Sequence, residues 1–139
     1  MGLHYPVEVQ QKLVHYIQLI ARWNKTFNLT AVRDVEAMVS KHLLDSLAVQ
    51  PYLEGKLILD VGSGAGLPGI PFAITSPDKQ FVLLDSNGKK TRFLMQAKID
   101  LKLTNVEIVH QRVEDYRPEK DGHAIYFDVI TARAYATTD

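Results

Sequence analysis

A glycine-rich loop between an apolar run and a helical stretch constrains the fold of this chain more than any other feature. Residues 60–71 read DVGSGAGLPGIP and follow the apolar run 57–59. Closely spaced glycines permit positive φ and close approach of a ligand. The N-terminus of a following helix favours an anionic group. Pro68 and Pro71 fit only in or near the first helical turn, where backbone amides lack partners. The segment therefore predicts a strand, a ligand-binding turn and a helix.

Two registers of the glycine motif are possible. Gly64-x-Gly66-x-x-Gly69 matches the dinucleotide pattern, whereas Gly62-x-Gly64-x-Gly66 begins directly at the end of the expected strand. We prefer the second register, because its first glycine lies where the turn must begin. It suits a ligand with a carboxylate and a ribose but no pyrophosphate. A tight turn without a ligand is disfavoured, because so many closely spaced glycines destabilise a fold unless a ligand or the backbone conformation requires them.

Acidic residues follow two other apolar runs. Asp85 ends the next run, 25 residues after Asp60. In a doubly wound fold an acid at this place reaches the ribose hydroxyls of a nucleotide ligand. The alternative is a simple helix N-cap, and we favour ribose binding because the spacing from the loop fits it. Glu114 and Asp115 lie past the third run, where they either meet an adenine base or form a solvated pair.

The organisation of the chain changes near Gly55. Before it, one apolar stripe at helical spacing predicts a first helix, and Asp34 is a plausible N-cap for a second helix, closed by Pro51 and Gly55. The stripe consists of Val9, Leu13, Tyr16, Ile20 and Trp23. We interpret Trp23 as a core residue, and His42 with Asp45, three residues apart, as a pair on the surface of the second helix.

Short apolar runs alternate with helical stretches after Gly55. The expected strands are 57–59, which ends at Asp60-Val61, 81–84, 106–109 and 127–130, and the expected helices are 67–76 and 89–103. This alternation predicts an α/β fold, a doubly wound parallel sheet covered on both faces. Four strands make half of such a sheet, and the last strand presents an exposed edge. We divide the chain into an N-terminal helical segment, 1–55, and a partial Rossmann-like domain, 56–139.

Composition excludes several classes of protein. The 139 residues are 46% apolar and 23% charged, which is typical of a globular domain. Sixteen basic and sixteen acidic residues give no net charge, which excludes a polycation but not a local basic face. There is no Cys, so disulfides, zinc fingers and thiol catalysis are excluded. No apolar run approaches the roughly 20 residues of a membrane span, and the N-terminus lacks a secretory pattern. We expect a soluble, cytoplasmic protein with no metal site.

The glycine loop and several further motifs resemble the ribosomal RNA small subunit methyltransferase G family, also called glucose-inhibited division protein B. The loop alone is typical of class I methyltransferases, and its Leu-Pro-Gly extension and the segment 23–30 make the resemblance specific. The matching stretches are 23–30 with Arg33-Asp34, 42–47, the loop with its extension 67–71, 83–86 with Lys89-Lys90, 112–114 and 132–134. The resemblance covers nearly the whole chain.

The resemblance implies an enzyme that uses S-adenosyl-L-methionine to methylate N7 of a guanosine in 16S ribosomal RNA of the small ribosomal subunit. It implies cofactor contacts by Gly62 and Leu67, an adenine site at Val113 and Glu114, and a catalytic and cofactor-contacting role for Arg133. Gly64 and Gly66 of the glycine motif and Asp85 after the second apolar run complete the expected cofactor site. Members of the family continue past residue 139, so we expect an N-terminal fragment that binds cofactor without full activity.

Guanine N7 carries a lone pair and no proton, so the expected reaction needs no general base, and no acid–base dyad is evident. Residues 86–112 hold six basic residues against two acids, which suits RNA phosphates or is simply a solvated face. Two alternatives stay open at this point. They are an NAD-dependent oxidoreductase, which the other glycine register favours, and a non-catalytic module that binds cofactor or RNA.

Overall fold

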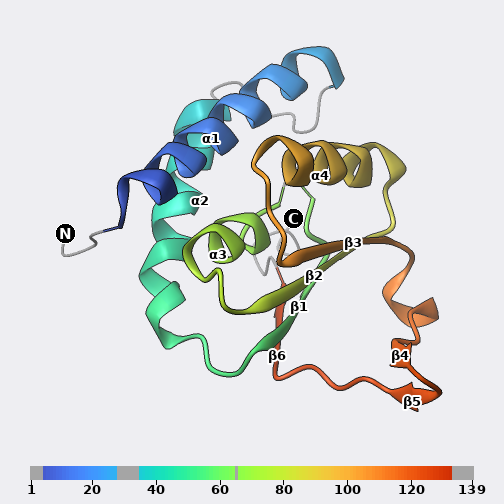
Figure 1. Cartoon of the computed structure of the whole chain (residues 1–139). Helices are drawn as coiled ribbons and strands as arrows, with labels where there is room; N and C mark the ends of the chain where they lie inside the picture. Colours follow the sequence, from blue (N-terminus) through green and yellow to red (C-terminus); the bar gives the residue numbers. More distant parts are fainter. Residues whose placement is uncertain (1–4, 28–34, 65, 133–139) are drawn as a thin grey trace.

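Four parallel strands form the central sheet (Figure 1). The computed structural model describes residues 5–27, 35–64 and 66–132. The strands are β1 (Leu57–Val61), β2 (Gln80–Asp85), β3 (Val106–His110) and β6 (Val129–Ala132). They lie in the order β3-β2-β1-β6, and all three neighbouring pairs are parallel. This order confirms the class of sheet that the alternating pattern predicts.

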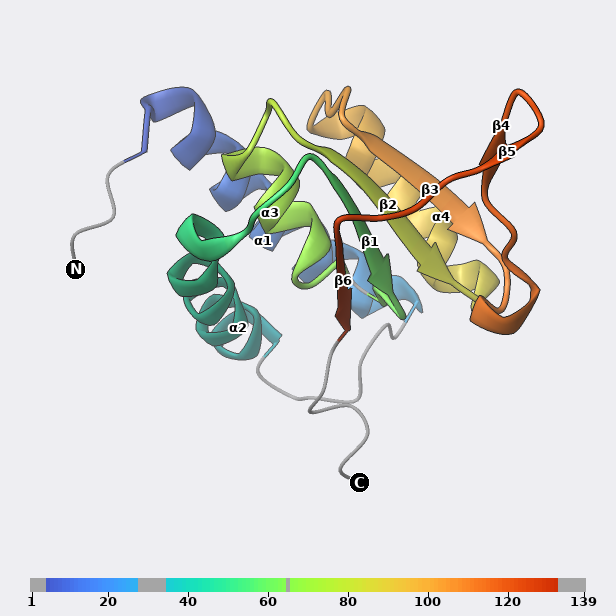
Figure 2. The same cartoon turned by 90° about the horizontal axis from the view of Figure 1, so that it is seen from below.

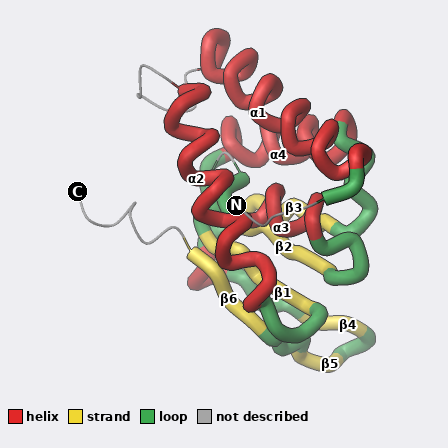
Figure 3. The backbone as a smooth tube through the Cα atoms, turned by 90° about the vertical axis from the view of Figure 1, so that its left-hand side faces the viewer, coloured by secondary structure: helices red, strands yellow, loops and turns green. Residues whose placement is uncertain are grey.

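Four helices lie on one face of the sheet (Figure 3). They are α1 (Val7–Phe27), α2 (Val35–Val49), α3 (Gly69–Thr75) and α4 (Gly88–Asp100). Ile58, Phe81 and Leu83 point from the strands into this layer, where they join Phe72 of α3 and Phe93 of α4 in one buried cluster. Near-continuous apolar strands need such cover, because both faces of a parallel sheet are removed from water.

The N-terminal helices join the same core. Leu13, Tyr16 and Ile20 of the predicted stripe are buried in it, and Trp23 meets Phe93 edge to face, with ring centroids 5.6 Å apart. Trp23 is partly buried and packs against the core, on the side that its place on the stripe predicted. Helices α1 and α2 thus belong to one hydrophobic cluster with the sheet. The division at residue 55 stays a prediction.

The segment after β3 covers the other face of the sheet (Figure 2). It crosses beneath the strands, forms the short hairpin β4 (Glu119–Lys120) and β5 (His123–Ala124), and returns to β6. Tyr116 and Phe127 pack on Leu59, Val82 and Leu84, and their own ring centroids are 6.4 Å apart. Burial, with a smaller contribution from the Glu107 charge, raises the pKa of the Tyr116 hydroxyl.

The hairpin was not predicted. Its turn places Asp121 and Gly122 at φ 55° and 79°, and the Asp-Gly pair is the usual sequence signal for a tight hairpin turn. The last strand was predicted at 127–130 and lies two residues later. The side chain of Asp128 accepts hydrogen bonds from the amides of Lys56 and Leu57, at 2.8 and 3.0 Å, so pairing with β1 starts at Val129.

Helix α4 ends earlier than the expected residue 103. Lys102 has φ 55°, a left-handed conformation that cannot continue a helix. Beyond it, the buried amide of Asn105 donates to the carbonyls of Ala73, Ser76 and Lys79 at 3.0–3.1 Å, which fixes the end of α3 beside β3. Within the described ranges, no helix has the length and apolar character that crossing a bilayer requires.

Candidate functional site

The glycine loop leaves the carboxyl end of β1 and turns back into α3. The amide of Gly62 donates to Leu84 O at 2.8 Å, and the amide of Gly66 donates to Ser63 O at 2.8 Å. Gly62, Gly64 and Gly66 have φ values of 68°, 57° and 99°, a region where side chains cost about 1–2 kcal/mol. All three glycines of the preferred register are therefore required by the backbone.

Gly69 plays a part that the preferred register left out. A Cβ on Gly69 would lie 2.3 Å from Leu83 Cδ2 and 2.6 Å from Asp60 Oδ2. Close approach of a helix to a strand is the role of the last glycine in the dinucleotide pattern. The structure thus uses glycines of both registers.

The carboxylate of Asp60 joins three elements beneath the loop. It is fully buried, accepts the amide of Gly69 at the start of α3 at 3.1 Å, and accepts the hydroxyl of Thr131 in β6 at 2.9 Å. A charged acceptor forms hydrogen bonds about twice as strong as neutral ones. Asp60 therefore ties β6 to the loop and to α3.

Asp85 holds the loop from the neighbouring strand. Its Oδ2 accepts the amide of Gly64 at 2.8 Å, and its Oδ1 accepts the amide of Asn87 at 2.8 Å. Asn87 in turn caps α4 by accepting the amide of Lys90 at 3.1 Å. The predicted ribose acid is thus not the helix cap itself. Each carboxylate oxygen can accept a further hydrogen bond, so both bonds leave capacity for a ligand hydroxyl.

Four of the predicted cofactor residues surround one cavity, which we call the loop cavity. It has a volume of about 330 Å³ and lies at the carboxyl edge of β1, β2 and β3. Gly62, Asp85, Val113 and Glu114 line it together with Val61, Leu84, Ser86, Gln111 and Arg112. Ligand sites in open α/β sheets lie at this edge. Val113 and Glu114 come from the 3-10 turn η2 (Val113–Asp115), which follows β3.

The other predicted residues lie elsewhere. Gly64 and Gly66 are buried inside the loop, so they shape the loop cavity without lining it. Leu67 is 2% exposed and lines a second cavity on the far side of the loop. Arg133 lies outside the described residues. Its chain neighbour Ala132 lines the second cavity.

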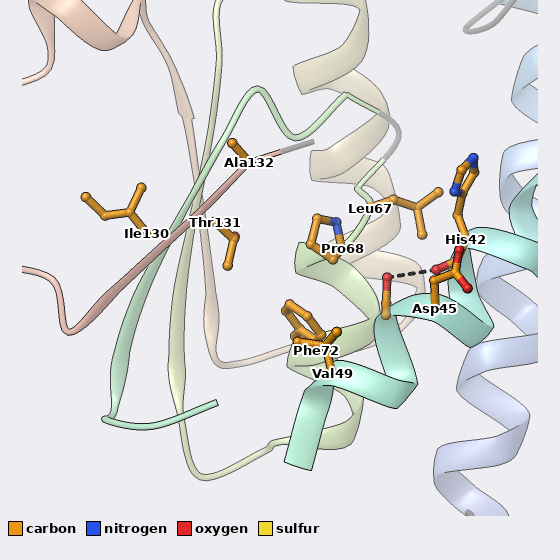
Figure 4. Close-up of a pocket in the computed structure, with 10 residues that line it drawn as sticks. His42, Asp45, Val49, Leu67, Pro68, Phe72, Ile130, Thr131 and Ala132 are labelled. Carbon is orange, nitrogen blue, oxygen red and sulfur yellow. Dashed lines mark hydrogen bonds between the residues drawn. The ribbon is translucent and has the colours of Figure 1, made fainter. Parts of the chain in front are cut away.

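This second cavity, which we call the α2 cavity, lies between α2, α3 and β6 (Figure 4). Its volume is about 440 Å³. The lining residues are His42, Asp45, Ser46, Val49, Leu67, Pro68, Phe72, Ile130, Thr131 and Ala132. Sequence reasoning placed His42 and Asp45 on a helix surface and missed that this surface faces β6. The spacing of His42 and Asp45 on one helix face was the available signal. The sequence near them does not indicate that β6 forms the opposite wall of the cavity.

No group of three or more metal-binding side chains occurs in the part of the chain that the structure describes. The arrangement is suited to holding an elongated polar ligand along the carboxyl edge. The carboxyl residues Asp85 and Glu114 line the cavity on one side of the loop, and the cavity on the other side has both apolar and polar walls.

A family model for rRNA small subunit methyltransferase G matches residues 9–139. The chain belongs to this family. Among curated members, it is 54% identical over 139 residues to Ribosomal RNA small subunit methyltransferase G of Ectopseudomonas mendocina, covering 99% of this chain and 63% of that protein. It is 56% identical over 136 residues to the Nitrosococcus oceani protein of the same name, covering 98% and 61%. The chain therefore spans less than two thirds of the length of these relatives.

Solved structures with this fold include other proteins of low sequence identity. The O-methyltransferase TomG of Streptomyces achromogenes, solved in complex with SAM, matches with a TM-score of 0.58 at 16% identity, covering 95% of this chain and 55% of that one. The YcgJ protein of Bacillus subtilis matches with a TM-score of 0.54 at 23% identity, covering 69% and 41%. Identities this low show a common fold. The methyltransferase G family and the structural likeness together confirm the expected class I methyltransferase fold.

Proposed function

We propose that this chain is the cofactor-binding part of an S-adenosylmethionine-dependent methyltransferase acting on RNA of the small ribosomal subunit. The observation that carries the proposal is the loop cavity, around which the fold collects Gly62, Asp85, Val113 and Glu114. Three of these residues come from segments separated by more than 20 positions in the sequence. Membership of the family supports the reaction class and the RNA substrate of this proposal.

The loop cavity fits the cofactor. Gly62 is exposed, has φ 68°, and a Cβ built on it meets nothing within 4 Å, so its backbone is open to a ligand. Asp85 offers carboxylate oxygens suited to ribose hydroxyls. Val113, which is 52% exposed, offers an apolar surface beside Glu114, suited to an adenine ring. Gly64, Gly66 and Leu67 then fix the path of the loop beside the methionine part.

When bound, S-adenosylmethionine supplies the electrophilic methyl group and its own leaving group. The proposed acceptor, N7 of a guanosine in 16S ribosomal RNA, has an in-plane lone pair and no proton. The chain is therefore not required to supply a general base, and its task is to hold two reactants in line. Such positioning accounts for roughly 7–11 kcal/mol of a barrier in favourable cases. We assign Arg133, which follows Ala132 in the sequence and lies outside the described residues, to contact both cofactor and base.

The RNA partner is supported by local charge. Lys89, Lys90 and Arg92 follow Asn87 in the first turns of α4, and Arg112 lines the loop cavity. Basic side chains at this edge would bind phosphates and make affinity fall with salt. A methyltransferase with this substrate would work in the cytoplasm. The alternative, an NAD-dependent oxidoreductase, finds no support in the family match.

Calorimetric titration of the 139-residue chain tests the cofactor assignment. We expect saturable binding of S-adenosylhomocysteine and no binding of NAD. Gly64→Val should abolish the binding, because Gly64 has a positive φ and its amide bonds to Asp85. Asp78→Asn, on the exposed turn before β2, is the matched control. Binding of NAD alone, or unchanged affinity in Gly64→Val, would overturn the assignment.

Methyl transfer to small-subunit RNA tests the reaction. The chain is incubated with radiolabelled S-adenosylmethionine and 30S subunits or deproteinised RNA. Chemical cleavage at 7-methylguanosine then reports the modified atom. Label on the RNA without cleavage at any guanosine would refute the N7 assignment. Cofactor binding without transfer would favour a cofactor-binding part that needs further sequence for activity.

A further inference from the structure

We propose that the α2 cavity holds the guanine base of the RNA substrate and that the Asp45 carboxylate selects guanine by accepting hydrogen bonds from N1–H and the N2 amino group. The proposal rests on the proposed function, since it names the acceptor subsite of that reaction. It assigns a specificity-determining role to α2, a helix that lies outside the expected cofactor-binding domain.

The two cavities meet at the ends of β1 and β6. Val61 lines the loop cavity, Ala132 lines the α2 cavity, and these residues are partners in the parallel ladder between the two strands. Neighbouring strands lie about 4.8 Å apart. A ligand that passes over the end of β1 therefore reaches the rim of the α2 cavity. This strand pair is also the point where the strand order reverses, the usual place for ligands in such sheets.

The walls of the α2 cavity suit a flat base. Leu67 and Pro68 of the glycine loop, Phe72 of α3 and Val49 of α2 supply apolar surface around a volume of about 440 Å³. This volume falls in the range of small-molecule sites. Enzymes that modify a base hold it between aromatic or apolar side chains, outside its stack. The side chain of Ile130 points away from the cavity (Figure 4), so β6 contributes mainly Thr131 there.

Polar groups gather at the end of the cavity nearest the glycine loop (Figure 4). His42 lies at the level of Leu67, Asp45 lies below it on α2, and Val49 and Phe72 lie at the opposite end. The hydroxyl of Ser46 donates to His42 O at 2.8 Å. The hydroxyl of Thr131 donates to Asp60. The side chain of Asp45, which is exposed, is therefore the carboxylate that this cavity offers to a ligand.

The chemistry of a carboxylate favours guanine over the other purines. Guanine presents two adjacent donors, N1–H and the N2 amino group, and an ionised carboxylate accepts both. Adenine presents an acceptor at N1, which a carboxylate repels. Hypoxanthine keeps N1–H but lacks the amino group. N7 is on a different edge of the ring, so a base held at α2 by its N1–N2 edge turns N7 away from α2, in the direction of β1 and β6.

Nucleotide titrations test this assignment without catalysis. The 139-residue chain, saturated with S-adenosylhomocysteine, is titrated with guanosine, inosine and adenosine 5′-monophosphates, followed by NMR shifts. We expect the guanosine nucleotide to bind about 10- to 100-fold more tightly than the inosine nucleotide, and the adenosine nucleotide to bind most weakly. In Asp45→Asn the preference for guanosine over inosine should fall to about 1, with unchanged affinity for S-adenosylhomocysteine. Asp78→Asn should keep the preference.

The outcomes separate the two proposals. Loss of the guanosine–inosine difference in Asp45→Asn supports the role of Asp45, because a merely structural change would weaken both nucleotides alike. Equal affinities in the wild-type chain, or no nucleotide binding while S-adenosylhomocysteine binds, would overturn this inference and leave the proposed function standing. Failure to bind S-adenosylhomocysteine would overturn both. The wild-type comparison needs no variant, so misfolding of Asp45→Asn would not prevent the test.

Discussion

The amide of Gly64 donates to the Asp85 carboxylate at 2.8 Å, which joins the glycine loop to the end of β2. The same carboxylate accepts the amide of Asn87 at the start of α4. One buried side chain thereby fixes two backbone segments that border the loop cavity. The shape of the cavity is then a consequence of β2 as much as of the glycines.

Removing this carboxylate should loosen both segments. Asp85→Ala deprives two amides of a charged acceptor, and bonds to charged groups contribute about 1.5–3 kcal/mol each. We expect the free energy of unfolding, from urea titration, to fall by about 3 kcal/mol, and binding of S-adenosylhomocysteine to be lost. Asp78→Asn is the control for a change in net charge. An Asp85→Ala chain with unchanged stability would contradict the structural part of this role.

Two glycines of the loop should respond differently to the same methyl group. Gly62→Ala adds a Cβ that meets nothing within 4 Å, so its cost is the backbone strain of a positive φ, about 1 kcal/mol. Because Gly62 lines the loop cavity, the affinity for S-adenosylhomocysteine should fall about tenfold, a change of about 1.4 kcal/mol.

Gly66→Ala adds the same strain and also a steric clash, with a Cβ 2.5 Å from Ile70 Cγ1 and 3.2 Å from the Tyr16 hydroxyl. Overpacking of this kind costs about 1–3 kcal/mol more. We therefore expect Gly66→Ala to be the less stable variant in urea and Gly62→Ala to lose affinity at little cost in stability. The reverse order of stability would contradict the described loop.

Local patterns predicted the elements that local forces determine. Apolar runs predicted the strands that end near Asp60 and Asp85. The glycine spacing, within a dozen residues, predicted the loop between β1 and α3. The stripe on α1 predicted its buried face for the same reason. The expected cofactor residues Gly62, Asp85, Val113 and Glu114 gather at one cavity because parallel strands bring their carboxyl ends to one edge.

Features fixed by distant contacts were not predicted. The start of β6 depends on Asp128 bonding to the amides of residues 56 and 57, which lie 72 and 71 positions away. The wall of the α2 cavity depends on α2 facing β6, which no pattern in residues 35–49 specifies. The apolar run predicted Asp85 at the end of β2 but not its bonds to Gly64 and Asn87.

The bond from Thr131 to Asp60 should stabilise the attachment of β6. Thr131→Val keeps the shape of the side chain but removes the hydroxyl donor to a fully buried carboxylate. We expect the free energy of unfolding to fall by about 1.5–3 kcal/mol. Thr131→Ser, which keeps the hydroxyl, is the matched control and should lose less. An unchanged free energy of unfolding in Thr131→Val would show that the hydrogen bond to Asp60 does not stabilise the attachment of β6.

Asp128 should make stability depend on pH in the acid range. Hydrogen bonds from the backbone amides of Lys56 and Leu57 are the main cause that lowers the pKa of this carboxyl, and the charge of Lys79 adds to them. Because the folded pKa lies below the unfolded value of about 3.9, the stabilisation is fully present above that value. It is lost as the pH falls through the folded pKa.

Comparison of Asp128→Asn with the wild-type chain checks this dependence. We expect the variant to be the less stable one in urea at pH 7, and the difference in free energy of unfolding to shrink as the pH is lowered from 5 toward 2. Asp78→Asn removes a carboxylate that makes no bond to the start of β1 and controls for net charge. A constant difference across that range would mean that the ionised form of Asp128 contributes nothing to holding β1 beside β6.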